Sequence, residues 1–143
     1  MMKIRITFFV AALLMLVASC TDPAMEIREE LNQGLKESYT GKHTEAIQHF
    51  KRVLELDSTQ AEAHLYLGRS YFNQAKYDLS MAEYDKAIHF DPKMGEAFRS
   101  RALLWKVLGD QDKFCADYIK AEDLGVKNLT NYTSKCRKAH LYK

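Results

Sequence analysis

Three cysteines are the residues of this sequence best suited to covalent chemistry, namely Cys20, Cys115 and Cys136. A cysteine thiol can be acylated, oxidised to a disulfide, bound to a metal or used as a nucleophile. No Cys-x-x-Cys spacing occurs in the chain, and no His or Cys cluster has the spacing of a zinc site. The cysteines therefore predict attachment or cross-linking rather than catalysis.

The remaining polar residues predict neither an enzyme nor a metal site. The five histidines include no pair at positions i and i+4, and His64 is expected to pack in an apolar layer. No nucleophile elbow, phosphate loop or dinucleotide fingerprint is present. Two carboxylate pairs, Glu29-Glu30 and Asp110 with Asp112, fall at expected helix ends or solvent faces. We expect no catalytic residue, no cofactor and no metal.

Cys20 follows a segment with the pattern of an export signal. Lys3 and Arg5 precede an unbroken apolar run from Phe8 to Ala18. This run is too short to cross a bilayer of about 30 Å as a helix, whereas its charge and length fit a signal peptide. The segment therefore predicts that the protein is exported.

The end of this segment, Val17-Ala18-Ser19-Cys20, resembles a bacterial lipobox. The resemblance implies a lipoprotein signal peptide over residues 1–19, cleavage before Cys20, and acyl chains such as palmitate on Cys20. An anchor linker is expected over residues 20–26. Several acyl chains, at about 0.8 kcal/mol per buried methylene, hold a protein on a membrane. The alternative is an ordinary secretory peptide whose cleavage site lies near a cysteine.

The charge of the mature chain gives no reason to expect a nucleic-acid partner. Residues 1–19 hold two basic residues and no acidic one, so that 19 basic and 19 acidic residues remain after cleavage. A neutral domain lacks the basic surface that attracts a polyanion.

A period of 34 residues organises the chain beyond this segment. The stretch YDKAIHFDP, residues 84–92, repeats the residue types of FKRVLELDS, residues 50–58. Apolar residues also recur at helical spacing within each period. Such a period predicts a supersecondary unit that buries its apolar faces by stacking on its copies. The unit 61–94 is the clearest. Its leucine, small, aromatic and proline residues are Leu67, Gly68, Tyr71, Ser80, Tyr84, Ala87 and Pro92.

This pattern of small and aromatic residues resembles the tetratricopeptide repeat (TPR). The resemblance covers residues 27–128 as three units, 27–60, 61–94 and 95–128. It implies an all-α, right-handed α-solenoid of three helix pairs. Phe114 departs from the pattern because a small residue is expected at its position. Residues 129–143 are expected to form a capping helix, with Leu129, Tyr132, Cys136 and Ala139 on one face.

The two later cysteines are expected to meet in this arrangement. Cys115 lies in the second helix of the third unit, and Cys136 lies in the cap that packs against it. A disulfide between them would stabilise the fold by about 3 kcal/mol in the chain-entropy model, and disulfides persist in exported proteins. The alternative is two buried free thiols.

In tetratricopeptide proteins the first helices of successive units line a concave groove. Tyr and Arg are the residue types that contribute most to binding energy at interfaces. We therefore expect another protein or peptide with an acidic or amide-rich segment to bind there. The carboxylate clamp of chaperone-binding relatives is not implied, because its positions here hold Leu31, Leu35, Glu96 and Ser100. The expected groove residues are Asn32, Leu35, Tyr39, Tyr66, Arg69, Asn73, Arg99, Leu103 and Lys106.

Together these features predict a lipid-anchored adaptor of the bacterial cell envelope that binds another protein. Thr21 stands where Asp would mark inner-membrane retention in enterobacterial lipoproteins, which favours the outer membrane. A structural subunit of an outer-membrane assembly, pilus or secretion complex is the alternative.

Overall fold

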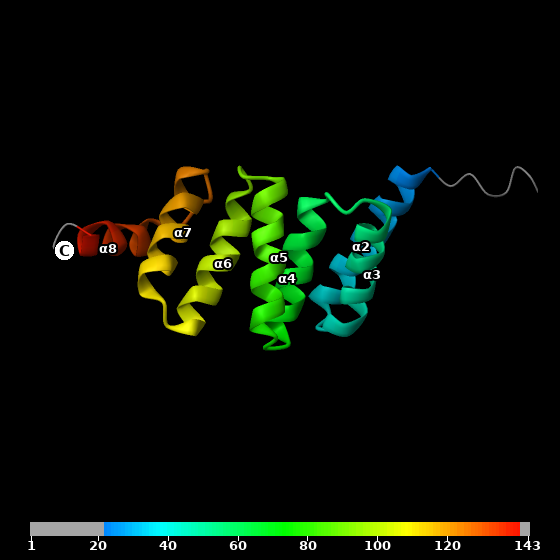
Figure 1. The fold of residues 1–143 in the computed structure, drawn as a ribbon, viewed down its shortest axis with the longest axis horizontal. Helices are drawn as coiled ribbons and strands as arrows, with labels where there is room; N and C mark the ends of the chain where they lie inside the picture. The colour runs from blue at the N-terminus through cyan, green and yellow to red at the C-terminus, as the bar shows by residue number, and fades with distance from the viewer. Residues whose placement is uncertain (1–21, 141–143) are drawn as a thin grey trace, which may run out of the picture.

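Seven α-helices and no strand make up residues 22–140, the part of the chain that the computed structural model describes (Figure 1). The predicted all-α solenoid of three helix pairs with a C-terminal helix is confirmed. The predicted signal peptide, Cys20 and Thr21 lie outside the described residues. The helices are α2 (Pro23–Tyr39), α3 (His43–Leu56), α4 (Ala61–Asn73), α5 (Tyr77–Phe90), α6 (Gly95–Leu108), α7 (Gln111–Asp123) and α8 (Thr130–His140).

The helices pair as hairpins that stack along the long axis of the molecule (Figure 1). The pairs are α2 with α3, α4 with α5, and α6 with α7. Each later pair contacts the pair before it, and α4 touches both α2 and α6. The first helices of the units therefore lie in one row. No helix within residues 22–140 is long and apolar enough to span a bilayer.

Small residues allow the two helices of a pair to approach closely. A Cβ atom added at Gly34 would lie 2.6 Å from the Phe50 ring, and one added at Gly68 would lie 2.7 Å from the Tyr84 ring. Phe50 and Tyr84 are fully or almost fully buried. The glycines and aromatics of the repeat pattern are therefore packing partners across each hairpin.

The turns inside the hairpins recur at the same period. Gly41, Ala75 and Gly109, spaced by 34 residues, have φ angles of 80°, 55° and 82°. This left-handed conformation ends the first helix of each pair and suits glycine, which has no Cβ to clash. The middle turn holds alanine instead, at a cost in backbone strain.

Helix α2 begins at Pro23 and therefore includes part of the segment 20–26, which the sequence predicts as an anchor linker. The Asp22 side chain accepts a hydrogen bond from the Ala24 N–H, and so caps the helix. Proline is well suited to the first helical position, where its missing N–H has no helical partner in any case.

The C-terminal helix α8 covers the end of the last pair and runs across the direction of α7 (Figure 1). Leu129 precedes it and is buried, as are its residues Thr133 and Cys136. Cys136 forms a disulfide with Cys115 of α7, with their Cα atoms 5.3 Å apart. Tyr132, expected on the packed face, remains 47% exposed. Helix α8 packs mainly on α7, and Lys106 of α6 reaches its Tyr132 ring.

One polar pair links the two helices of the first and second units at equivalent positions. In the first unit Glu30 of α2 lies 2.7 Å from His49 of α3. In the second unit the order is reversed, and His64 of α4 lies 2.6 Å from Glu83 of α5. The buried His64 ring also stacks on Phe90. His64 therefore packs, as expected, and in addition makes a buried hydrogen bond with Glu83.

The third unit changes this pair. Phe98 takes the position of Glu30 and His64, and Asp117 takes the position of His49 and Glu83. Arg101 then binds both carboxylate oxygens of Asp117 at 2.8 Å and lies over the Phe98 ring. Hydrogen bonds from its guanidinium to Asp117 and Asp85 outweigh burial and raise the pKa of Arg101.

Candidate functional site

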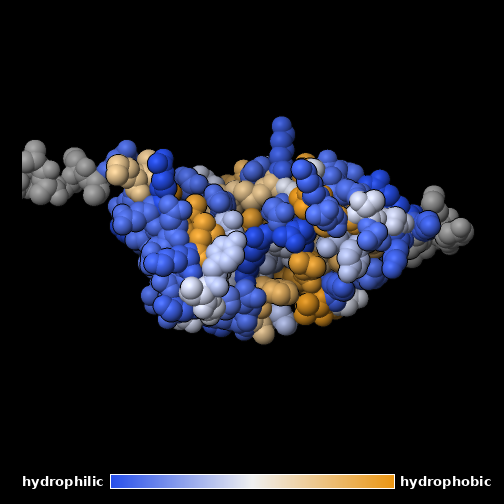
Figure 2. Space-filling model, turned by 180° about the vertical axis from the view of Figure 1, so that it is seen from behind, coloured by the Kyte–Doolittle hydropathy of each residue, from blue (hydrophilic) through white to orange (hydrophobic). Residues whose placement is uncertain are grey.

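Two adjoining hollows lie along the row of first helices. The first hollow lies over α2 and α4 and is lined by Leu35, Ser38, Tyr39, Tyr66, Arg69 and Asn73. The second hollow lies over α4 and α6 and is lined by Arg69, Phe72, Asn73, Tyr84, Arg99, Ser100 and Leu103. Because Arg69 and Asn73 line both, the hollows form one continuous groove. Figure 2 shows hydrophobic groups separated by hydrophilic residues across the middle of the molecule.

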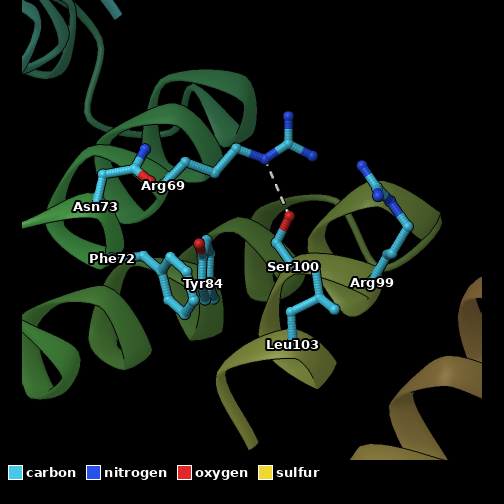
Figure 3. Close-up of a pocket in the computed structure, with 7 residues that line it drawn as sticks. All are labelled: Arg69, Phe72, Asn73, Tyr84, Arg99, Ser100 and Leu103. Atoms are coloured by element: carbon cyan, nitrogen blue, oxygen red, sulfur yellow. Dashed lines mark hydrogen bonds between the residues drawn. The ribbon is translucent and has the colours of Figure 1, made fainter. Parts of the chain in front are cut away.

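The second hollow, of about 200 Å³, has an aromatic floor and a cationic rim (Figure 3). The Phe72 and Tyr84 rings lie side by side below, and the guanidinium groups of Arg69 and Arg99 lie above. Tyr84 comes from the second helix of its pair and reaches the groove because Gly68 leaves room for its ring.

The two groove arginines share one carboxylate. Arg69 Nη2 donates to Glu96 Oε2 at 2.9 Å, and Arg99 donates to the same oxygen from Nε at 2.9 Å and Nη2 at 2.7 Å. Arg69 Nε also donates to the Ser100 hydroxyl at 3.0 Å, as Figure 3 shows. These bonds fix both guanidinium groups at the rim and leave the three charged groups with a net charge of +1.

The same contacts keep Glu96 ionised. Partial burial acts to raise the pKa of Glu96, but the hydrogen bonds and charges of Arg99 and Arg69 outweigh it, so that the pKa lies below its ordinary value. The rim thus keeps its two cations and one anion throughout the neutral pH range.

Aromatic side chains form the wall of the first hollow. The Tyr66 ring stacks on Phe50 with their centroids 5.8 Å apart, and the Arg69 guanidinium lies 5.4 Å from the Tyr66 centroid. Tyr39 at the end of α2 is 91% exposed. An exposed tyrosine beside a fixed one and a cation is a surface suited to protein contact.

Seven of the nine predicted groove residues line these two hollows. Asn32 instead borders a separate hollow on α2, together with Met25 and Arg28. Lys106 lines neither hollow and lies over the Tyr132 ring, with Nζ 5.3 Å from its centroid.

Sequence reasoning did not assign Ser38, Phe72, Tyr84 or Ser100 to the groove. Ser38 and Phe72 lie on first helices, next to the predicted residues Tyr39 and Asn73, so position could have indicated them. Tyr84 gives no such signal, because second helices are expected to lie away from the groove. Its access depends on the depth of the contact at Gly68.

The described residues bring together no metal ligands. Within residues 22–140, no three His, Cys, Asp or Glu side chains are grouped so that they could hold a metal ion. Asp110 of the predicted carboxylate pair is the N-cap of α7 and accepts a hydrogen bond from the Lys113 N–H.

Comparison with known families identifies the repeated unit. Residues 34–75 match the family model described as "TPR repeat", and residues 61–94 match that described as "Tetratricopeptide repeat". The chain therefore contains tetratricopeptide repeats.

A curated relative shares only this repeat region. It is the protein of Arabidopsis thaliana named "Probable UDP-N-acetylglucosamine--peptide N-acetylglucosaminyltransferase SEC", which is 26% identical over 81 residues. The match spans 57% of this chain but 8% of that protein. The named activity belongs to a much longer chain.

Solved structures of similar fold include TPR domains. The first TPR of Spaghetti (RPAP3) bound to an HSP90 peptide has a TM-score of 0.73 at 19% identity, covering 82% of this chain and 94% of that one. The second TPR domain of human RPAP3 with an HSP70 peptide has a TM-score of 0.71 at 24% identity, covering 80% and 98%. The Yersinia enterocolitica secretion chaperone SycD has a TM-score of 0.70 at 19% identity, covering 79% and 89%. These likenesses establish the fold.

Proposed function

We propose that this chain is a lipid-anchored adaptor of the bacterial cell envelope, which binds a segment of another protein in the groove formed by α2, α4 and α6. Binding, not catalysis, is its activity. The observation that carries the proposal is the pair of adjoining hollows, in which exposed aromatic and apolar side chains surround two fixed guanidinium groups.

Relatives of the same fold support a binding role. Two of the similar structures hold peptides from HSP90 and HSP70 in their repeat domains. The clamp positions expected for such carboxylate ends hold Leu31, Leu35, Glu96 and Ser100 in this chain. The proposed ligand is therefore a different segment, held within the groove.

The envelope part of the proposal rests on the sequence of residues 1–21. The basic start, the apolar run and Val17-Ala18-Ser19-Cys20 favour export, cleavage before Cys20 and acylation of that cysteine, with the outer membrane as destination. An anchor confines the groove to a surface and raises its effective concentration near other envelope proteins, so that moderate affinity suffices.

Site-specific photocrosslinking in the native envelope tests the binding role. A photoreactive amino acid at Asn73, which lines both hollows, should crosslink to a partner protein. The same amino acid at Lys51, an exposed position on α3, should not give that product. Equal crosslinking from both positions, or none from Asn73, would contradict a binding groove.

Mass spectrometry of the mature N-terminus tests the anchor separately. Acyl chains on Cys20 and release of the Cys20→Ser variant from the membrane fraction are the expected results. An unmodified Cys20, or a chain that retains residues 1–19, would contradict the anchor and leave the groove unaffected.

A structural subunit of an envelope assembly is the second candidate, and one observation favours it. Val107 and Leu108, two neighbouring apolar residues at the end of α6, are about half exposed. An assembly role predicts tight, salt-resistant association with one complex that Val107→Lys disrupts. The adaptor role predicts weaker, salt-sensitive association that changes in the groove disrupt.

A further inference from the structure

We propose that the groove selects an extended segment in the polyproline II conformation, in which two apolar side chains lie about three residues apart with a carboxylate side chain between them. This inference rests on the proposed binding function and specifies the ligand.

Each hollow offers an apolar subsite. Leu35, Tyr39 and Tyr66 supply the apolar surface of the first hollow. Phe72 and Leu103 supply that of the second, above the buried Tyr84 ring. Leu103 is 36% exposed although it lines a hollow, so its side chain is available to a ligand. An apolar side chain in either hollow would be removed from water on several sides.

The distance between the subsites follows from the helix row. The first hollow spans α2 and α4, and the second spans α4 and α6, so they are offset by about one helix. Packed helices lie about 8–10 Å apart. A polyproline II chain rises about 3.1 Å per residue with three residues per turn, so that side chains about three residues apart point to the same side. The offset therefore corresponds to about three residues of an extended ligand.

Charge determines what lies between the subsites. Arg69 and Arg99 are the charged residues that line the two hollows, and no acidic residue among those described lines either. Arg69 lines both hollows and therefore stands between the subsites. Glu96 neutralises one of the two guanidinium groups and occupies only some of their N–H donors. The remaining donors and net positive charge favour one ligand carboxylate at this point.

The test is a selection from a display library of random short peptides, using the full mature chain as bait. Enriched peptides are then synthesised with a fluorescent label, and their affinity is measured by anisotropy. We expect enrichment of two apolar residues about three positions apart, with Asp or Glu between them. Replacing that acidic residue by its amide should weaken binding about tenfold or more.

Variants of the protein localise the interaction. Arg69→Met should weaken the acidic peptide about tenfold and leave its amide version almost unchanged, since the two changes remove the same contact. Leu103→Asp should weaken all selected peptides. The matched controls are Arg52→Met, which alters an exposed arginine of α3, and Val107→Asp, which alters the exposed apolar residue one turn along α6. Circular dichroism checks that each variant remains helical.

The outcomes separate this inference from the proposed function. Enriched peptides that bind in the groove but lack the acidic residue or the spacing would overturn the inference and leave peptide binding intact. Additive effects of Arg69→Met and the peptide amide would overturn the carboxylate assignment. Failure to enrich any peptide above the level of the Leu103→Asp variant would overturn both.

Discussion

At the scale of single residues, Arg69 joins the parts of the groove. It contacts the Tyr66 ring, the Ser100 hydroxyl and the Glu96 carboxylate, and it lines both hollows. Five N–H donors in a rigid plane allow one guanidinium to hold these partners and still face a ligand. Lysine at this position would lose that geometry.

Ala75 is a residue at which substitution should increase stability. Its φ of 55° is strained for alanine, whereas Gly41 and Gly109 fill the equivalent turns. Ala75→Gly removes this strain but gives the unfolded chain more freedom, so we expect a net gain of about 0.5 kcal/mol in the free energy of unfolding. Urea denaturation measures it. The reverse change, Gly109→Ala, is the control. It should lower the free energy of unfolding by about 1 kcal/mol through backbone strain alone, because no atom lies within 4 Å of the added Cβ. A lower urea midpoint for Ala75→Gly would contradict this account.

Gly68→Ala should destabilise the second unit by a different mechanism. The new Cβ would lie 2.7 Å from Tyr84 ring atoms, and that ring is only 2% exposed and cannot easily move. We expect a loss of about 2 kcal/mol, the usual effect of overfilling a packed core. Thermal unfolding measures it.

A second change provides the control for Gly68→Ala. Gly68→Ala combined with Tyr84→Leu should cost less than the sum of the two single changes, because the smaller side chain makes room for the methyl group. Strict additivity would show that the two residues are not in tight contact.

Glu83 should make stability depend on pH in the acid range. Burial acts to raise the pKa of Glu83, but hydrogen bonds from His64 and Lys86 outweigh it and lower the pKa below 4.5. A carboxyl whose folded-state pKa is lowered stabilises the fold above its ordinary pKa, and this contribution is lost as pH falls through the folded-state value.

The measurement is the difference in urea midpoint between the native chain and Glu83→Gln. That difference should be largest near neutral pH and should shrink as pH falls below about 4.5. Glu29→Gln, at an exposed position on α2, is the matched control for loss of a carboxylate. A difference in urea midpoint for Glu83→Gln that stays constant down to pH 3 would show that the Glu83 carboxyl does not make stability depend on pH.

At the scale of elements, α8 depends on a few attachments to α7. They are the Cys115–Cys136 disulfide, the Thr133 hydrogen bond to Glu122, and the Arg137 contacts with Glu122 and Asp123. Exposed charge pairs contribute little to stability, so the disulfide should dominate.

Reduction of the disulfide should therefore loosen α8 selectively. We expect a loss of about 3 kcal/mol in the free energy of unfolding, as the chain-entropy model gives for a loop of this size. Hydrogen exchange should become faster in α8 than in α4. Cys136→Ser should reproduce the effect without reductant, and equal acceleration throughout the chain would contradict a local role for the bond.

Phe114 shows where the sequence was harder to interpret at this scale. The repeat pattern expects a small residue there, and the structure instead places its ring 4.8 Å from Tyr118 and 6.4 Å from Tyr132, by centroids. Helix α8 packs on the end of the α6–α7 pair, and the rings of Phe114 and Tyr118 contact Tyr132 there. The sequence contained these residues but not the crossing direction of α8, which depends on three-dimensional packing.

The fold as a whole could be predicted because the glycines and aromatic residues that pack across each hairpin recur every 34 residues. Gly68, Tyr84 and their equivalents at Gly34 and Phe50 determine the hairpin contact, and the groove side follows from the helices that carry them. Lys106 and Asn32 were placed in the groove by the same rule and lie outside the two hollows. The 34-residue period does not determine which way side chains point near the two ends of the row of first helices.

At the scale of the whole molecule, stability should depend on all three units. Leu65, Tyr84 and Ala87 of the second unit pack in one cluster with Ala97 and Leu104 of the third. A chain ending after Pro92 would expose this apolar surface, and units of this kind rarely fold in pairs. We expect the shortened chain to show a broad, weak thermal transition by circular dichroism. A sharp transition at the native temperature would mean that the first two units are autonomous.

The reversed order of the two His–Glu pairs bears on how hairpins of the same shape find their proper partners. If α2 paired with α5 in error, Glu30 would face Glu83, and if α4 paired with α3, His64 would face His49. Either error would break both carboxylate–imidazole hydrogen bonds, and the first would bring two carboxylates together in a partly buried contact. Similar units in one chain can mispair, when a helix of one unit packs on a helix of another unit or of a neighbouring molecule. The reversed order of His and Glu makes such mispaired hairpins less favourable than the native ones.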